Sequence, residues 1–340
     1  MKVFKKYPLK PHNTFNIDVE AELFTEIKNQ EDLIELKDYL TSQRMPVLVL
    51  GGGSNILFTK NYIGLIIKNN LTGIEIIDEK KDSVIIEAKA GVQWDDLVLF
   101  AVENNLGGIE NLSLIPGTVG ASPIQNIGAY GQEAKDSILL VKGIDLEDFQ
   151  TKSFTNEGCR FGYRSSIFKS KLKGRFFITS VHFLLTKNPV LNTSYGTIRK
   201  ELESLGKNDS AITIKDVREA VIRIRESKLP DTKVLGNAGS FFKNPSINKS
   251  WYNNLKKVFH DITGYETGID EIKISAGWLI ENAGLKGFRI GNAGVYEKQA
   301  LVLVNYGSAT GEEILNLSNI IKEKVKQKFG VVLQEEVNIH

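Results

Sequence analysis

The chain has 340 residues with 43 basic and 41 acidic side chains, and the resulting net charge of +2 gives no general attraction to nucleic acids or membranes. Its length exceeds one typical hydrophobic core and predicts two or three domains. With 41% apolar residues, 25% charged residues and a single cysteine, Cys159, the composition is that of a globular protein without an internal disulfide.

The N-terminal stretch MKVFKKYPLK is basic, but no apolar segment follows it, so we do not expect a secretory signal. No stretch of the sequence approaches the length of a transmembrane helix. One cysteine without a partner fits a reducing compartment. We therefore expect a cytoplasmic protein with no membrane segment.

Helices and strands alternate irregularly in the N-terminal half. Apolar residues in 29–43 recur at helical spacing, and MPVLVLGGGSN (45–55) indicates a short buried strand that runs into a glycine turn. Further strands are predicted at 64–68 and 83–90. A helix is predicted over 93–108, where glycines would stop it.

The segment LIPGTVGASPIQNIGAYGQ (114–132) is too long and too rich in glycine for an ordinary connector, and long ordered loops tend to be functional. Glycine lets main-chain N–H groups converge on an anion, so this loop and GGGSN together are candidates for a pyrophosphate site. GGGSN alone is explained more simply as a tight turn. It does not begin a Rossmann fingerprint, because Ile56 stands where that pattern needs glycine.

The C-terminal half again mixes both element types. Strands are predicted at 138–146, 175–186 and 331–339, and helices at 213–228 and 311–330. The segment 187–195 breaks the pattern and suggests a domain boundary. Without a steady alternation of strand and helix, the chain is predicted to have an α+β fold and not a doubly wound sheet.

The run VLGNAGSFFKNP (234–245) places Ser240 between Gly239 and two phenylalanines. No serine lies in a G-x-S-x-G motif, which argues against a hydrolase nucleophile. From the local sequence, Ser240 is a turn residue, a helix cap, a nucleophile or a proton donor. The four histidines form no HExxH motif and do not cluster with Cys159, so no metal site is expected.

Eight motifs extend in order over nearly the whole chain: GGGSN, IPGTVGASPIQNIGAYG, RFGYRSSIF, SKLPD, GNAGSFFKNP, AGWLIENAGLKG, QALVLVN and QEEV. Together they resemble the type I UDP-N-acetylenolpyruvoylglucosamine reductases, also called UDP-N-acetylmuramate dehydrogenases. The resemblance implies an FAD-binding region of the vanillyl-alcohol oxidase type in two subdomains, over residues 1–187. It also implies a C-terminal α+β substrate domain over 188–340, whose last strand returns to the active site.

The family's reaction uses NADPH to reduce FAD, and the flavin then gives hydride to an enolpyruvyl nucleotide sugar in peptidoglycan synthesis. Negative charge develops beside the substrate carboxylate, so the chemistry needs a cation there and a proton donor at the α-carbon. By resemblance the catalytic residues are Arg164, Ser240 as the proton donor, and Glu336. The adjacent Glu335 would point the other way on a strand.

The resemblance also implies binding residues. FAD would be bound by the glycine loops, through Gly51, Gly52, Gly53, Ser54, Asn55, Gly117, Gly120, Ser122, Pro123, Asn126, Gly128 and Tyr130. The uridine diphosphate group would be bound by Tyr195, Arg225, Lys228, Asn244 and Gln299. Ser165 departs from the family, which often has an acidic residue or asparagine there, and this puts a contact to Arg164 in doubt.

Each of these residues has a plainer interpretation without the family. Arg164 would form a surface ion pair, Glu336 would be a solvated strand charge, and Lys228 would complement a helix dipole. Two rival functions are an FAD-dependent oxidoreductase of the same fold acting on another substrate, and a nucleotide-sugar binding protein without chemistry. The uridine diphosphate residues argue against the first rival and the complete catalytic set against the second. We expect a monomer that binds a nucleotide sugar and no nucleic acid.

Overall fold

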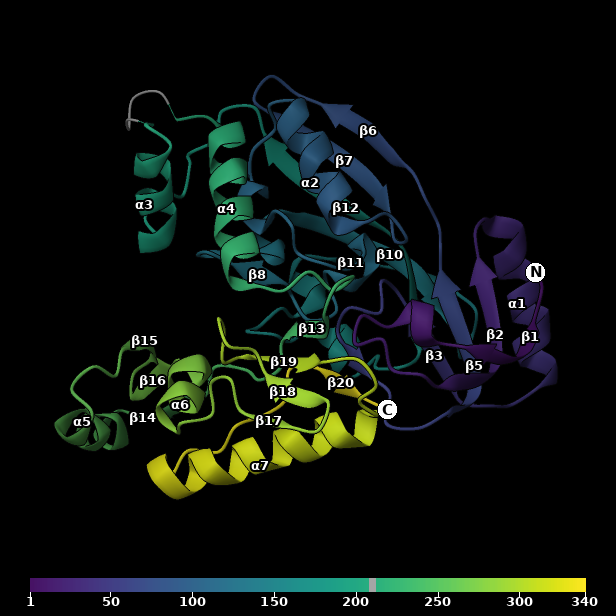
Figure 1. Cartoon of the computed structure of the whole chain (residues 1–340). Coiled ribbons are helices and arrows are strands. Elements are labelled where there is room, and N and C mark those ends of the chain that lie inside the picture. Colours follow the sequence, from purple (N-terminus) through teal and green to yellow (C-terminus); the bar gives the residue numbers. More distant parts are fainter. Residues whose placement is uncertain (208–211) are drawn as a thin grey trace. The chain divides into compact units, whose positions relative to one another are not determined.

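The structure is a computed structural model that describes residues 1–207 and 212–340. By their contacts these residues form two compact units, and each unit is assembled from separate segments of the chain. Unit 1 consists of Met1–Tyr7, Ala21–Gly53 and Tyr62–Ser227, and unit 2 of Pro8–Glu20, Ser54–Asn61 and Lys228–His340. Helices and antiparallel strands occur in both units, in agreement with the α+β prediction (Figure 1).

The contacts divide the chain differently from the functional domains expected from the sequence. Residues 188–227, which the sequence interpretation assigns to the substrate domain, group with unit 1. Contact grouping describes packing and does not identify which domain binds which ligand. The functional division at 187/188 therefore stays a prediction.

The first sheet of unit 1 has the order β1-β2-β5-β3 and is made by β1 (Phe4–Pro8), β2 (Glu20–Ile27), β5 (Tyr62–Asn69) and β3 (Val47–Leu50). Strand β5 pairs in parallel with both β2 and β3. Helix α1 (Gln30–Ser42) buries Leu36 among Ile27, Leu65 and Ile67 of this sheet. The strands and the helix predicted here are confirmed.

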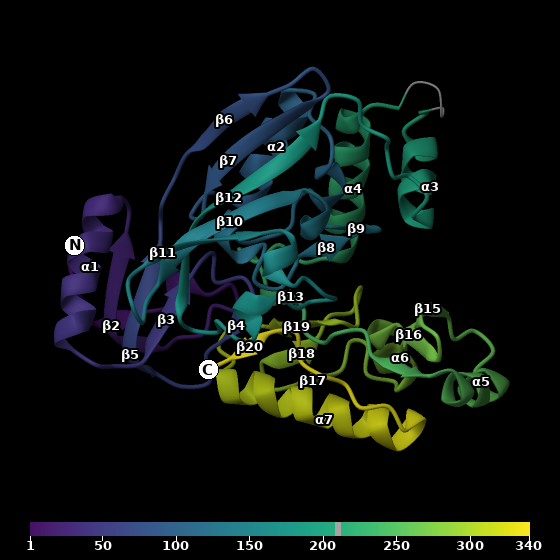
Figure 2. The same cartoon turned by 180° about the vertical axis from the view of Figure 1, so that it is seen from behind.

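The second sheet of unit 1 is antiparallel and has the order β11-β10-β12-β7-β6 (Figure 2). Its strands are β11 (Thr151–Thr155), β10 (Ile138–Asp145), β12 (Phe176–Thr186), β7 (Ser83–Lys89) and β6 (Ile74–Glu79). Alternate residues of β7 are buried, which is the two-residue period of a strand with one face on a core. Helix α2 (Trp94–Glu103) packs on that core.

The structure corrects the end of the helix predicted over 93–108. Helix α2 ends at Glu103, before the two glycines that were expected to stop it. The side-chain amide of Asn104 donates to the Phe100 carbonyl at 2.8 Å, and Asn105 adopts a left-handed φ of 56°. Asparagine tolerates this conformation better than most residues, so the chain turns here without glycine.

Two further helices and a short hairpin complete unit 1. Helix α3 (Gly196–Ser204) and helix α4 (Ile214–Lys228) bury a shared apolar cluster that includes Ile198, Leu202 and Val221. Helix α4 confirms the helix predicted over 213–228. Strands β8 (Gly128–Ala129) and β9 (Gln132–Glu133) form a hairpin within the glycine-rich loop.

Unit 2 contains three small sheets. They are formed by β13 (Gly236–Ser240), β19 (Val302–Asn305), β18 (Ala293–Val295) and β17 (Arg289–Ile290); by β14 (Ser246–Asn248), β16 (Glu271–Ile274) and β15 (Gly264–Gly268); and by β4 (Ile56–Leu57) with β20 (Asn338–Ile339). Its helices are α5 (Lys249–Val258), α6 (Ala276–Asn282) and α7 (Gly311–Phe329), of which α7 lies along β18 and β19.

Helix α7 begins and ends at the residues expected from its caps. Thr310 and Glu313 form a capping box, with Thr310 N–H donating to the Glu313 carboxylate at 2.7 Å and Glu313 N–H to the Thr310 hydroxyl at 3.2 Å. Gly330 ends the helix with a left-handed φ of 69°. In the described parts of the chain, no helix combines the length and the apolar character that a membrane span requires.

The strand predicted over 331–339 is wrong in extent, because only Asn338–Ile339 is a strand. Residues 334–336 run beside 241–243, but the two segments form a ladder pair only between Phe242 and Glu335. The partner segment follows an irregularity in β13 between Asn237 and Ser240. The apolar pattern of the sequence does not reveal that its partner is irregular.

We predict that Cys159 is inert in the folded protein. It is fully buried, and burial raises the pKa of its thiol to about 12. At pH 8 the thiolate fraction would fall from about a quarter in the unfolded chain to about 10⁻⁴. Reaction with an aromatic disulfide reagent should therefore be at least about a hundredfold slower in native buffer than in denaturant. A fast, complete reaction of the native protein would contradict this.

Candidate active site

Two glycine-rich loops of unit 1 pack main chain against main chain. Gly51 to Gly53 follow β3, and Gly117 precedes the short 3₁₀ helix η3 (Val119–Ala121). A Cβ added to Gly52 would lie 2.9 Å from the Gly117 Cα, and one added to Gly51 would lie 2.6 Å from the Thr118 Oγ1. Gly52 meets main chain and Gly51 meets the Thr118 hydroxyl, and neither position leaves room for a side chain.

The paired loops offer donors for an anionic group. Among the described residues, the main-chain N–H groups of Gly52 and Gly117 have no hydrogen-bond partner. The Gly117 carbonyl accepts from Trp94 N–H at 2.9 Å, and Gly120 N–H donates to the Ala90 carbonyl at 2.9 Å, so the second loop is fixed to its surroundings. Glycine N–H groups without an internal partner, on a fixed loop, fit the pyrophosphate of a dinucleotide.

Two polar side chains predicted for the FAD site are turned into the protein. Ser122 and Asn126 are both fully buried. The Ser122 hydroxyl donates to the Val119 carbonyl at 2.7 Å. The Asn126 amide donates to the Glu133 carboxylate at 2.9 Å and to the Gly162 carbonyl at 3.1 Å. Ser122, Asn126 and the buried Pro123 between them therefore shape the loop, and the side chains of Ser122 and Asn126 are bonded within the protein.

Arg164 is held by this loop. Its guanidinium donates to the carbonyls of Gly128 at 2.8 Å and Asn126 at 3.4 Å. A Cβ on Gly128 would lie 3.2 Å from the Arg164 Nη1, so glycine makes room for the approach. Ser165 pairs through its main chain with Gly162. The loop carbonyls, and not the residue after the arginine, orient the guanidinium.

The structure brings Tyr130, Tyr195 and Arg225 together. The rings of Tyr130 and Tyr195 meet edge to face with centroids 5.6 Å apart. Burial lowers the pKa of Arg225, and the neighbouring Tyr130 and Asp95 oppose that change. The Asn111 amide donates to the main-chain carbonyls of Tyr130 at 3.1 Å and Asn192 at 2.9 Å. It thereby joins the glycine-rich loop to residues 188–195, the tyrosine loop, which carries Tyr195.

Asp95 contacts the glycine-rich loop, and the sequence did not reveal this contact. Burial acts to raise its pKa, but the Arg218 guanidinium and the Leu114 N–H outweigh burial and lower it. Arg218 donates to both carboxylate oxygens, at 2.7 and 2.8 Å, and the Leu114 N–H donates at 2.5 Å. Arg225 donates to the Leu114 carbonyl at 3.2 Å. Leu114, the first residue of the loop, is thereby held at a left-handed φ of 58°.

Lys68 was also missed. It lies on β5, and its ammonium donates to the carbonyl of Gly51. A lysine at the end of the apolar run GLIIK, one strand away from GGGSN, is the signal that the sequence offered.

In unit 2, Ser240 and Glu336 stand on neighbouring main chains. The Phe241 carbonyl accepts from Glu336 N–H at 2.8 Å, and Phe241 N–H donates to the Leu301 carbonyl at 2.8 Å. The Asn237 side chain accepts from Gly239 N–H at 3.0 Å, and Gly239 has a left-handed φ of 69°. This turn ends β13 with Ser240 exposed.

The carboxylate of Glu335 is bound to α7, which argues against it as the catalytic acid. It accepts from the Lys322 ammonium at 2.8 Å and from the Ser318 hydroxyl at 3.2 Å. Asn55, the last residue of GGGSN, contacts Glu336: its side-chain amide donates to the main-chain carbonyl of Glu336 at 3.3 Å. Ser54 and Asn55 thus belong to unit 2, whereas Gly51 to Gly53 belong to unit 1.

Asn244 and Gln299 both lie near the start of α6. The side-chain oxygen of Asn244 accepts from Ala276 N–H at 3.0 Å. The Gln299 Oε1 lies 3.3 Å from the position that a Cβ on Gly277 would take. Lys228 is exposed at the last position of α4. Of the predicted uridine diphosphate residues, Tyr195 and Arg225 lie in unit 1, and Lys228, Asn244 and Gln299 lie in unit 2.

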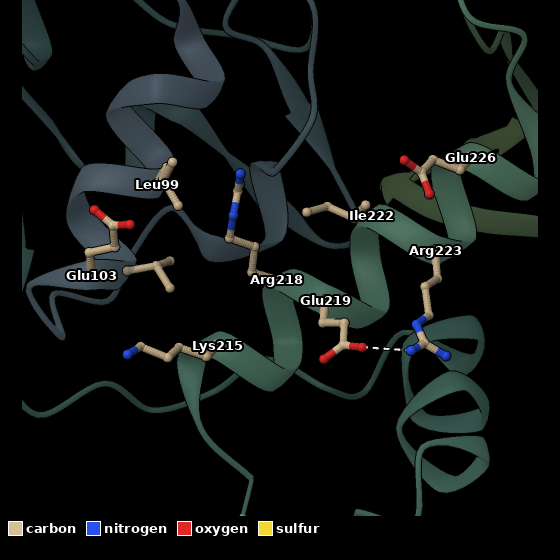
Figure 3. Close-up of a pocket in the computed structure, with 9 residues that line it drawn as sticks. Leu99, Glu103, Lys215, Arg218, Glu219, Ile222, Arg223 and Glu226 are labelled. Carbon is tan, nitrogen blue, oxygen red and sulfur yellow. Dashed lines mark hydrogen bonds and ion pairs between the residues drawn. The ribbon is translucent and has the colours of Figure 1, made fainter.

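A pocket of about 520 Å³ lies elsewhere on unit 1, between α2 and α4 (Figure 3). Leu99, Val102 and Ile222 contribute apolar surface, and charged side chains of both helices surround them. None of its lining residues was predicted for the site. The chemistry expected from the sequence is therefore not assigned to this pocket.

Known proteins match the chain along its whole length. A sequence model described as "UDP-N-acetylenolpyruvoylglucosamine reductase, C-terminal domain" matches residues 230–340, and one described as "FAD binding domain" matches residues 21–148. The UDP-N-acetylenolpyruvoylglucosamine reductase of Flavobacterium johnsoniae is 50% identical over 100% of both chains. That of Pseudomonas aeruginosa is 44% identical over 98% of this chain and 97% of its own. The chain belongs to this family.

A solved structure agrees in fold. UDP-N-acetylenolpyruvylglucosamine reductase from Thermus caldophilus superposes with a TM-score of 0.68 at 22% identity, over 99% of this chain and 98% of its own. Together with the FAD-binding domain, this match confirms the predicted α+β fold with an FAD-binding region and a C-terminal domain.

We predict that Gly52→Ala lowers the affinity for FAD by about tenfold or more. The new Cβ would press on the Gly117 Cα, and overpacking costs about 1–3 kcal/mol. The measurement is a titration of the deflavinated chain with FAD. Gly158→Ala is the matched control, because its Cβ would come no closer than 3.4 Å to a neighbouring atom. Unchanged affinity in Gly52→Ala would show that the loops separate easily.

Proposed function

We propose that this chain catalyses the NADPH-dependent reduction of UDP-N-acetyl-3-O-(1-carboxyvinyl)-glucosamine to UDP-N-acetylmuramate, a peptidoglycan precursor. The observation that carries the proposal is full-length membership in the UDP-N-acetylenolpyruvoylglucosamine reductase family. An oxidoreductase of the same fold acting on another substrate is not favoured, because the identity extends over the substrate domain as well as the FAD-binding domain.

FAD, once reduced by NADPH, supplies hydride to the β-carbon of the enolpyruvyl group. In our proposal the main chain of the two glycine loops binds its pyrophosphate, with Gly52 and Gly117 as donors. Ser122, Pro123, Asn126, Gly128 and Tyr130 give the second loop its shape. Ser54 and Asn55 continue the first loop toward Glu336.

Arg164 is proposed to bind the substrate carboxylate. A guanidinium can donate two parallel hydrogen bonds to a carboxylate, and it stabilises the charge that develops after hydride arrives. Contacts with the carbonyls of Gly128 and Asn126 fix the orientation of this side chain before any ligand binds. The loop proposed to bind FAD would thus also orient Arg164, the residue proposed to bind the substrate carboxylate.

Ser240 is proposed to deliver the proton to the α-carbon, and Glu336 to complete the catalytic set. Their main chains are linked through Phe241, and Phe241 and Phe242 are buried against each other with ring centroids 5.2 Å apart. A serine on a main chain anchored in this way loses little freedom when it acts as a general acid.

The uridine diphosphate group is proposed to contact Tyr195, Arg225, Lys228, Asn244 and Gln299. Arg225 and Lys228 carry the positive charge that a diphosphate needs. The nucleotide-sugar substrate belongs to cytoplasmic precursor synthesis, so we propose that the enzyme is cytoplasmic. We also propose that it acts as a monomer.

The visible spectrum tests the function directly. We expect the purified protein to be yellow, to bleach anaerobically with NADPH, and to recover its absorbance near 450 nm when the enolpyruvyl nucleotide is added. UDP-N-acetylglucosamine, which lacks the enolpyruvyl group, is the control and should not restore the absorbance. A colourless protein that cannot be reconstituted with FAD would overturn the proposal.

Ser240→Ala should separate the two half-reactions. Flavin reduction by NADPH needs no proton at the substrate α-carbon, so it should proceed at a normal rate. Re-oxidation by the enolpyruvyl nucleotide should slow by about 10²–10⁴-fold, the usual scale for a lost general acid. Stopped-flow absorbance measures both steps, with the exposed Ser246→Ala as control. Equal slowing of both steps would make Ser240 a structural residue instead.

A further inference from the structure

We propose that Lys68 is a positioning residue for the cofactor: by holding the Gly51 carbonyl it turns the Gly52 N–H outward as a donor for the FAD pyrophosphate. The inference rests on the proposed function, since it requires that the glycine loops bind FAD. Strand β5 carries no residue of the family motifs. The inference gives this strand a role in binding the FAD pyrophosphate.

The position of Lys68 is fixed by the first sheet of unit 1. Strand β5 lies between β2 and β3, and the Lys68 Cα is in register with Glu26 on one side and with Leu50 on the other (Figure 1). Gly51 follows Leu50 directly. The lysine is therefore one strand away from the point where β3 becomes the glycine loop, and its ammonium donates to the Gly51 carbonyl.

The planarity of the peptide group carries the effect to the next residue. In a trans peptide the carbonyl of one residue and the N–H of the next point in opposite directions. With the Gly51 carbonyl bound to Lys68, the Gly52 N–H points away from the lysine, and it has no hydrogen-bond partner among residues 1–207 and 212–340. Glycine has no Cβ to resist rotation of this peptide, so the lysine supplies the orientation.

The Lys68 ammonium is partly buried beside the first glycine loop. Burial lowers the pKa of this ammonium, and Glu26 opposes that fall. Glu26 also pairs with Lys28 at 2.7 Å, and Asp32 acts on Lys28 as well. A pyrophosphate bound nearby would be a further anionic partner for the Lys68 ammonium, and partial burial makes this attraction less sensitive to salt than a surface pair.

The test compares Lys68→Met, Lys68→Arg and wild type, each deflavinated and titrated with FAD by flavin fluorescence. Loss of a hydrogen bond from a charged donor should weaken FAD binding about 10- to 100-fold in Lys68→Met. Lys68→Arg keeps a cationic donor and should stay within about threefold of wild type. Lys37→Met removes one positive charge from the exposed side of α1 and should leave FAD affinity unchanged.

A second measurement separates positioning from folding. The melting temperature of deflavinated Lys68→Met should match wild type, and its affinity for riboflavin, which lacks the pyrophosphate, should be unchanged. Unaltered FAD affinity in Lys68→Met would overturn the inference. So would equal losses for FAD and riboflavin, or a large fall in melting temperature, since either would mean that Lys68 supports the fold. A wild-type chain that binds no FAD would instead overturn the proposed function.

Discussion

The contact between the two glycine loops is the constraint on which the candidate cofactor site depends. Because Gly52 and Gly117 touch through their main chains, the segment after β3 and the segment before η3 must keep one spacing. Gly120 extends the same constraint, since a Cβ there would lie 2.6 Å from the Ala90 Cβ, at the end of β7. The two glycine loops are therefore connected to both sheets of unit 1, and the packing of those sheets determines the geometry of the loops.

Buried polar groups then shape the rest of the long loop. Asp95 and Arg225 hold Leu114 at its start, Asn126 binds Glu133 and Gly162 near its middle, and Asn111 ties Tyr130 to the tyrosine loop. Polar groups such as these would be costly to bury alone, and each of these side chains makes at least one hydrogen bond here. The same loop also orients Arg164 through the carbonyls of Asn126 and Gly128. The proposed cofactor loop and the arginine proposed to bind the substrate carboxylate are therefore held by the same contacts.

The sequence predicted elements whose pattern is local and missed those that depend on distant partners. Helix α7 has its cap, its apolar stripe and its glycine stop within one segment, and its prediction is confirmed. The strand predicted over 331–339 failed because its partner is irregular beyond β13. The glycine motifs were found from sequence, but the reason that Gly52 must be glycine is Gly117, which lies far away in the chain. Asp95 and Lys68 carry no motif, and their importance comes from the carbonyl and N–H groups that they meet.

This arrangement shows that polar residues within a proposed binding motif can serve the protein's own structure. Ser122 and Asn126 use their side chains within the protein, whereas the main-chain N–H groups without a partner among the described residues are those of Gly52 and Gly117. The entropy of ordering the loop is then lost on folding and not again on binding, which favours tight retention of a cofactor. The same reasoning applies to Ser240, whose main chain is anchored on both sides while its hydroxyl stays exposed. In both units, main-chain hydrogen bonds hold the segment that carries the proposed reactive or binding group, and the surrounding side chains maintain its conformation.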